Sequence, residues 1–165
     1  MYFGSCFSQR KILRRAKIMS TSKQALGRFG EELVAKKCSC PKCKRTKTFK
    51  RLPANFKCAD LICDFCGFLA QVKTTTSRTI DAPATILGAA WRPQKERMDS
   101  GIYFPLFLVV RCNTQTAAYY LPTDFQSPAL FTPRTPLSKT ARKAGWQGFR
   151  YALAILSRHE LVRLF

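Results

Sequence analysis

The chain has 165 residues, and its 46% of hydrophobic residues is enough to build the core of one domain. Its formal net charge is +20, from 29 Lys and Arg against 9 Asp and Glu. Such an imbalance repels itself and is typical of proteins that bind nucleic acid. The longest apolar run, at 102–110, contains Pro105 and is too short to cross a bilayer of about 30 Å, so we expect no membrane-spanning helix.

Residues 1–20 form a basic segment with five Lys or Arg and no acid. The segment lacks the continuous apolar stretch and the small-residue cleavage site of a secretory signal. We therefore interpret it as a disordered arm before a single domain at 21–165, in a cytoplasmic protein. Met19 is an alternative start of the chain.

The first predicted element is a helix over 22–37, because Leu26, Phe29 and Leu33 recur at helical spacing and residues 20–22 offer N-caps. Gly30 within it costs about 1 kcal/mol relative to Ala in a helix interior. We therefore expect Gly30 to pack closely against another part of the backbone.

Three segments rich in β-branched and aromatic residues predict a meander, at 46–52, 57–63 and 68–74. Pro83 and Pro93 bracket the sequence ATILGAAW, and we expect a helix within 82–99 that leads to the next strand.

Two further strands are predicted at 102–111 and 116–121, the first apolar enough to be buried on both faces. The chain is then loop-like until Lys139, where a short basic helix begins. Helix, meander, helix and buried strand together predict an α/β sandwich with a mixed sheet.

Two Cys-x-x-Cys pairs, separated by 19 residues, have the spacing of a structural four-cysteine zinc site: Cys40, Cys43, Cys63 and Cys66. Gly67 follows the second pair, where the backbone must curl over the metal. Either Cys38 or Cys58 is an alternative ligand, while the isolated Cys6 and Cys112 are not expected to bind metal. Four thiolates leave no open position for water, so hydrolysis at this protein would need a second metal.

Gln71 and Lys73 are two residues apart on a predicted strand, so their side chains share one face, and Asp60 lies on the neighbouring strand. A carboxylate, an amide oxygen and an ammonium group on one hairpin are suited to metal-assisted hydrolysis of a phosphodiester.

The segments CPKC, CADLICDFCGFLAQVKT and PLSKTARKAGWQG resemble the DpnI restriction endonucleases of the PD-(D/E)xK nuclease superfamily, from about residue 23 to about residue 150. The resemblance implies an α/β restriction-endonuclease-like core with an embedded zinc site, without the winged-helix domain that follows it in that family. By the same resemblance Asp60 and Gln71 bind a catalytic Mg²⁺, and Lys73 orients or activates the attacking water. Glu31 looks like the helix glutamate that completes some of these sites.

The neutral Gln71 departs from the carboxylate of the DpnI pattern, which weakens attraction for a hard cation. Two hypotheses for the function follow from this site. The first is a Mg²⁺-dependent DNA endonuclease of the type II restriction class, with dependence on DNA methylation left open. The second is a weak or inactive zinc-containing DNA-binding protein on the same fold. A basic RNA-binding protein is a third alternative.

Double-stranded DNA is the expected partner, because no acid occurs between Leu33 and Ala59 while basic residues accumulate there. From this stretch, and from the similarity of TARKAGW to the DpnI group, we expect six DNA contacts: Lys47, Lys50, Arg51, Arg142, Lys143 and Trp146. Phosphate contacts carry no sequence information, so no recognition site follows. The oligomeric state, monomer or dimer, is left open.

Overall fold

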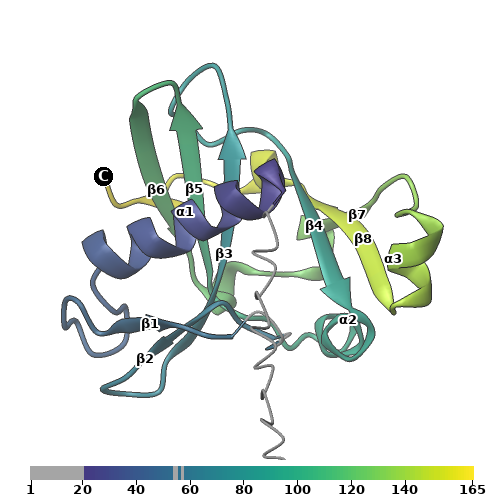
Figure 1. The fold of residues 1–165 in the computed structure, drawn as a ribbon, viewed down its shortest axis with the longest axis horizontal. Coiled ribbons are helices and arrows are strands. Elements are labelled where there is room, and N and C mark those ends of the chain that lie inside the picture. Colours follow the sequence, from purple (N-terminus) through teal and green to yellow (C-terminus); the bar gives the residue numbers. More distant parts are fainter. Residues whose placement is uncertain (1–20, 54–55, 57) are drawn as a thin grey trace, which may run out of the picture.

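The computed structural model describes residues 21–53, 56 and 58–165 (Figure 1). The basic arm expected at 1–20 lies outside the described residues. The helices are α1 (Ser22–Lys37), α2 (Arg92–Asp99) and α3 (Lys139–Lys143), with short 3-10 turns at Thr123–Phe125, Pro128–Leu130 and Leu153–Ile155. The strands are β1 (Phe49–Arg51), β2 (Leu61–Cys63), β3 (Leu69–Thr76), β4 (Ile86–Trp91), β5 (Leu106–Cys112), β6 (Gln115–Leu121), β7 (Phe131–Pro133), β8 (Trp146–Tyr151) and β9 (Val162–Arg163).

The described strands form a six-stranded sheet, in the order β1-β2-β3-β5-β6-β9, and a three-stranded sheet, in the order β4-β8-β7. In the larger sheet β3 and β5 are parallel and the other neighbours are antiparallel. The predicted mixed α/β organisation is therefore confirmed. The central strand β5 is buried at its first five residues, as its continuous apolar sequence predicted.

Helix α1 lies across one face of the larger sheet (Figure 1). The side chain of Thr21 caps the helix, and the side-chain oxygen of Gln24 accepts a hydrogen bond from the backbone N–H of Thr21. The helix therefore begins at a capping box. The buried Val34 of α1 packs with Ala70 and Val72 of β3 and with Phe107 of β5. This core fixes the α1 face of β3.

The opposite face of the larger sheet packs against the three-stranded sheet. Leu106 and Leu108 of β5 share this second core with Ile86 of β4 and with Phe149 and Tyr151 of β8. Strands from the C-terminal third of the chain thus reach back to cover β3 and β5. Within the described residues, no helix is both long and apolar enough to cross a membrane.

The prediction of a helix within 82–99 is wrong for its first half, because the segment ATILGAAW contains the strand β4 and the helix α2 begins only at Arg92. Burial alternates along β4, with Ile86, Gly88 and Ala90 inside, but the apolar and 61% exposed Leu87 conceals this period of two in the sequence. Pro93 stands in the first turn of α2, where a missing N–H costs nothing, so it starts the helix rather than ending one.

Candidate active site and metal centre

The side chains of the four predicted cysteine ligands form one cluster. The sulfur atoms of Cys40, Cys43, Cys63 and Cys66 all lie within 4.8 Å of one another. Two sulfur pairs, Cys40 with Cys66 and Cys43 with Cys63, are 3.6 and 3.7 Å apart. Zn–S bonds of about 2.3 Å at tetrahedral angles require sulfur separations of about 3.8 Å. The spacing fits a tetrahedral zinc ion and is too wide for disulfides.

Two similar turns hold these sulfurs, and we call them together the zinc clip (residues 40–44 and 63–67). In the first turn the N–H of Lys44 donates to the carbonyl of Cys40 at 2.8 Å, and in the second the N–H of Gly67 donates to that of Cys63 at 2.9 Å. Gly67 has φ +71°, the left-handed conformation expected where the backbone curls over the metal. The clip joins the end of α1 to the hairpin of β2 and β3.

The other described cysteines lie outside this cluster. Cys38 is buried in the α1 core, and the sulfur of Cys58 accepts a hydrogen bond from Arg97 at 3.3 Å. Cys112 contacts the carbonyl of Arg78. Neither alternative ligand is therefore needed, and Cys6 lies outside the described residues.

Gln71 and Lys73 share the face of β3 that looks toward the three-stranded sheet, because they pair in register with Leu106 and Leu108 of the second core. Ala70 lies on the α1 face instead, as the alternation of a strand requires. Lys73 is half-buried and forms no salt bridge with any described acid.

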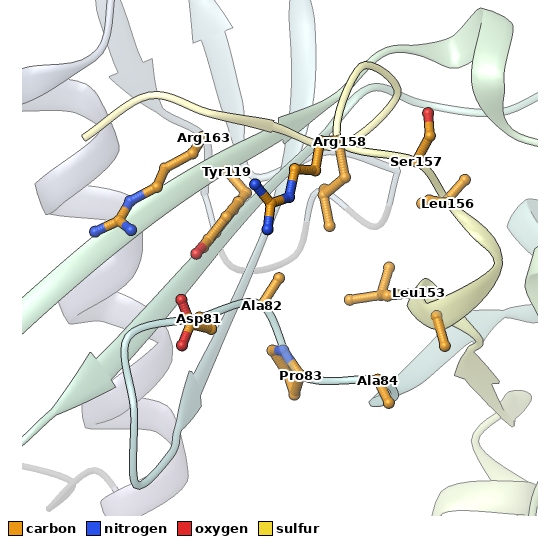
Figure 2. A pocket seen from close by; sticks show the side chains of 12 residues that line it. Asp81, Ala82, Pro83, Ala84, Tyr119, Leu153, Leu156, Ser157, Arg158 and Arg163 are labelled. Carbon is orange, nitrogen blue, oxygen red and sulfur yellow. The ribbon is translucent and has the colours of Figure 1, made fainter.

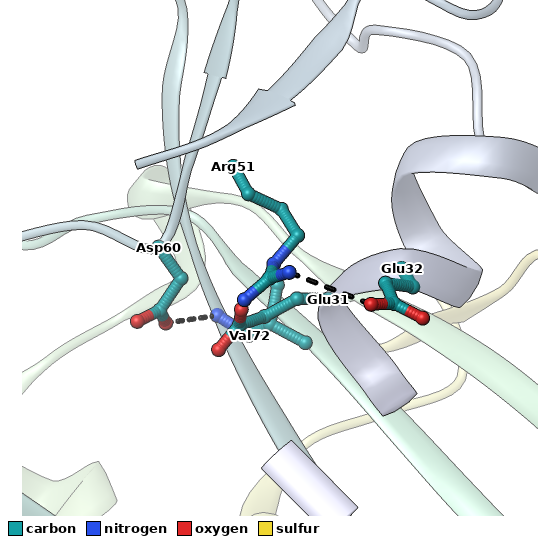
Figure 3. A network of polar contacts seen from close by, with 5 residues as sticks. All are labelled: Glu31, Glu32, Arg51, Asp60 and Val72. Carbon is teal, nitrogen blue, oxygen red and sulfur yellow. Dashed lines mark hydrogen bonds and ion pairs between the residues drawn. The ribbon is translucent and has the colours of Figure 1, made fainter. Parts of the chain in front are cut away.

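Asp60 lies immediately before β2, where the pairing of β2 with β3 ends. Since Leu61 pairs with Ala70, Asp60 stands opposite Gln71 across the hairpin. Its Oδ2 accepts a hydrogen bond from the N–H of Val72 at 2.7 Å (Figure 3). The carboxylate thus replaces a missing ladder partner and is held beside β3.

The side chain of Gln71 is held at both ends. Its Nε2 donates to the carbonyl of Cys58 at 3.3 Å, and its Oε1 accepts from the hydroxyl of Tyr151 at 3.4 Å. Burial raises the pKa of Tyr151, and the negative charge of Asp60 raises it further. Tyr151 therefore remains a neutral donor near both Gln71 and Asp60. Sequence reasoning missed this residue, which comes from a strand 80 positions away.

Glu31 lies on the α1 side of the sheet rather than beside Gln71. Its Oε2 accepts a hydrogen bond from the Nε of Arg51 at 2.8 Å, and Glu32 forms an ion pair with the same guanidinium at 3.4 Å (Figure 3). Glu31, Arg51 and Asp60 border one open pocket of about 450 Å³. The structure thus brings Glu31 to the same pocket as Asp60 but gives it a cationic partner.

The residues predicted to bind DNA occupy two regions. Lys47 and Lys50 are exposed near the zinc clip, although Lys50 pairs with Asp64 at 3.4 Å. The charge of Arg51 is engaged by the two glutamates of α1. Arg142 and Trp146 line a second pocket of about 250 Å³ beside α3, and Lys143 is exposed on that helix.

A separate cavity of about 570 Å³ lies between the 81–84 loop and the C-terminal segment (Figure 2). Arg158 and Arg163 line one part of it, and the apolar Leu153 and Leu156 line another. None of the predicted site residues lines this cavity.

The fold and the site define a mixed α/β protein with four cysteines positioned to hold a metal ion, next to a hairpin that carries a carboxylate and an amide. The sequence matches the family described as DpnI: Dam-replacing family over residues 10–164, so the chain belongs to this family. Membership implies a methylation-dependent restriction-type nuclease and hence DNA as the partner. No curated protein matches the sequence.

Proposed function

We propose that the protein is a Mg²⁺-dependent endonuclease that cleaves double-stranded DNA with a PD-(D/E)xK-type site in the variant form Asp60, Gln71, Lys73. The observation that carries the proposal is the junction of β2 and β3. There Asp60 is fixed by the N–H of Val72, and Gln71 is fixed by the carbonyl of Cys58, two residues before Asp60. Family membership supports the same activity.

The donor set suits a hard cation. Mg²⁺ prefers oxygen ligands, and it is commonly held by one or two carboxylates together with substrate phosphates. Asp60 would supply the carboxylate and Gln71 the amide oxygen, which has a second lone pair beside the hydrogen bond from Tyr151. When bound, such a cation polarises the phosphate and lowers the pKa of a water molecule.

Lys73 would hold the anionic phosphodiester on the same face of β3. It is half-buried and lacks an anionic partner among the described residues. An ammonium group in that setting gains from a phosphate oxygen, which is a strong charge-assisted acceptor. In this proposal Lys73 orients the scissile phosphate and the attacking water.

Plasmid digestion tests the proposal, with methylated and unmethylated DNA and with Mg²⁺ or Mn²⁺. Asp60→Asn should lower cleavage by about 100-fold or more, because loss of a residue that only orients a metal ligand already costs about 10–100-fold. DNA binding should be nearly retained. Asp64→Asn is the matched control, because Asp64 is an exposed aspartate on the same hairpin, paired with Lys50. Normal cleavage by Asp60→Asn would refute the site.

Two further variants address the amide and the ammonium. Gln71→Glu should preserve or raise cleavage because a carboxylate attracts the cation more strongly. Lys73→Ala should abolish cleavage and weaken DNA binding only by the loss of about one phosphate contact.

The second candidate function is DNA binding without cleavage. The observation that favours it is the engagement of Gln71 at both ends of its neutral amide. It predicts retardation of intact DNA under every metal condition, and no effect of Lys73→Ala on any measured property.

A further inference from the structure

The exposed end of the zinc clip carries an aromatic ring that is not part of either hydrophobic core. Phe65 lies between two of the cysteines, and 55% of it is exposed. The guanidinium carbon of Arg45 lies 3.6 Å from the centre of this ring. We call the exposed residues around this contact the clip tip: Lys42, Lys44, Arg45, Lys47 and Phe65.

The clip tip holds charge that the described protein does not neutralise. Its four cations form no salt bridge with any described acid, whereas the neighbouring Lys50 and Arg51 are both paired. An uncompensated cluster of this kind attracts a polyanion.

The turn that holds the first cysteine pair places a lysine where the second turn has glycine. Lys44 and Gly67 follow the second cysteine of their turns and make equivalent hydrogen bonds. Both are in the left-handed conformation, with φ +62° and +71°. Glycine adopts this conformation without strain, and lysine does not. Lys47 of the clip tip is left-handed as well, with φ +57°, so two of the four charged residues hold this conformation. Strained residues of this kind cluster at functional sites.

We propose that the clip tip is a DNA contact, in which Arg45 makes a paired hydrogen bond to two acceptors on the duplex. The Phe65 ring covers one face of the guanidinium and leaves its N–H edge for the acceptors, so Phe65 is a positioning residue. Lys42, Lys44 and Lys47 neutralise neighbouring phosphates. The inference rests on the proposed function in taking duplex DNA as the partner, and it gives the zinc centre a role in binding.

Fluorescence anisotropy with the full-length, zinc-loaded protein and labelled duplex DNA tests the inference, in buffer that contains neither Mg²⁺ nor a chelator. Arg45→Ala should weaken binding by about tenfold and lower the salt dependence by about one phosphate contact. Arg111→Ala is the matched control, because its guanidinium also lies over an aromatic ring, that of Phe29 at 5.1 Å, outside the clip. That control should lose about twofold or less.

The ring is tested separately. Phe65→Ala should weaken binding by several-fold, and Phe65→Leu, which keeps an apolar side chain but no aromatic face, should weaken it as well. Phe125→Ala removes an aromatic ring of similar exposure, 43%, and should not change the affinity. Zinc content and melting temperature, measured on each variant, separate a lost contact from a damaged clip.

Lys44 separates charge from backbone. Lys44→Ala and Lys44→Gly should weaken DNA binding equally, but only Lys44→Gly should raise the melting temperature, because only glycine relieves the left-handed backbone. An equal loss on all duplex sequences for Arg45→Ala identifies phosphate oxygens as the acceptors, and a loss confined to one sequence identifies the O6 and N7 of guanine.

Zinc-loaded Arg45→Ala and Phe65→Leu proteins that bind DNA as the wild type does would overturn the inference and leave the proposed function intact. A wild-type protein that binds no DNA would overturn both. Both would be supported if Asp60→Asn loses cleavage and if Arg45→Ala and Phe65→Leu weaken DNA binding as expected.

Discussion

Gly30 allows α1 to approach β3 more closely than any other residue would. A Cβ added at Gly30 would stand 1.8 Å from Oγ1, 3.0 Å from Cβ and 3.3 Å from Cγ2 of Thr74. Rotation of the Thr74 side chain gives incomplete relief, because it leaves the Cβ of Thr74 only 3.0 Å from the added atom. Overpacking of a core costs about 1–3 kcal/mol, and the better helix propensity of Ala offsets about 1 kcal/mol. We therefore expect Gly30→Ala to destabilise the protein by about 2 kcal/mol, near the upper end of the balance.

Urea unfolding with a common m-value measures this change. Gly27→Ala on the same helix is the matched control. A Cβ at Gly27 meets nothing within 4 Å, so the propensity term acts alone and should stabilise by about 1 kcal/mol if the position behaves as an exposed helix interior.

The second half of the experiment removes the Thr74 side chain that an added Cβ at Gly30 would meet. The Oγ1 of Thr74 is buried and has no hydrogen-bond partner among the described residues. Thr74→Ala should be nearly neutral, because the lost methyl packing is offset by the removal of an unpaired polar group. In the Gly30→Ala, Thr74→Ala double variant most of the penalty should disappear, with a coupling energy of about 1–2 kcal/mol. A Gly30→Ala protein as stable as the wild type would refute the reasoning.

Two further predictions concern the metal centre and the buried tyrosine. Metal analysis should find about one zinc per chain, and Cys63→Ser should lose both zinc and most of the folding stability, because binding energy is folding energy at such sites. Cys112→Ser, outside the cluster, should retain both. Tyr151→Phe should change the response to alkaline pH. Burial raises the pKa of Tyr151 above its unfolded value of about 10, so the wild type should lose stability as pH rises beyond 10, and the variant should lack that part of the loss. Equal pH dependence of the two unfolding free energies would contradict this.

The parts of the molecule that depend on neighbouring residues could be predicted from the sequence. The α1 helix follows from apolar spacing and a capping residue. The zinc clip follows from ligand spacing and from Gly67, since each turn closes within a few residues. The hairpin of β2 and β3 follows from its length and from the turn between its strands, and it places Asp60 opposite Gln71.

The parts that depend on distant pairing could not be predicted. The strand β8 begins at Trp146, directly after Gly145, and its pairing with β4 and β7 provides the reason for its extended conformation. The partner of Arg51 is likewise set by the packing of α1 on the sheet, which local patterns do not encode. Alternation of buried Phe149 and Tyr151 along β8 is a weak signal that could have indicated the strand.

The neutral amide at position 71 is explained by its surroundings. The position offers one donor, the Tyr151 hydroxyl, and one acceptor, the Cys58 carbonyl, and an amide is able to satisfy both. A glutamate would leave the carbonyl without a donor and would place a second negative charge near Asp60. Gln71 therefore favours the stability of the fold at the expense of cation attraction. If the site is catalytic, DNA phosphates must complete the coordination, so Gln71→Glu should bind Mg²⁺ more tightly without DNA while unfolding at lower urea concentration.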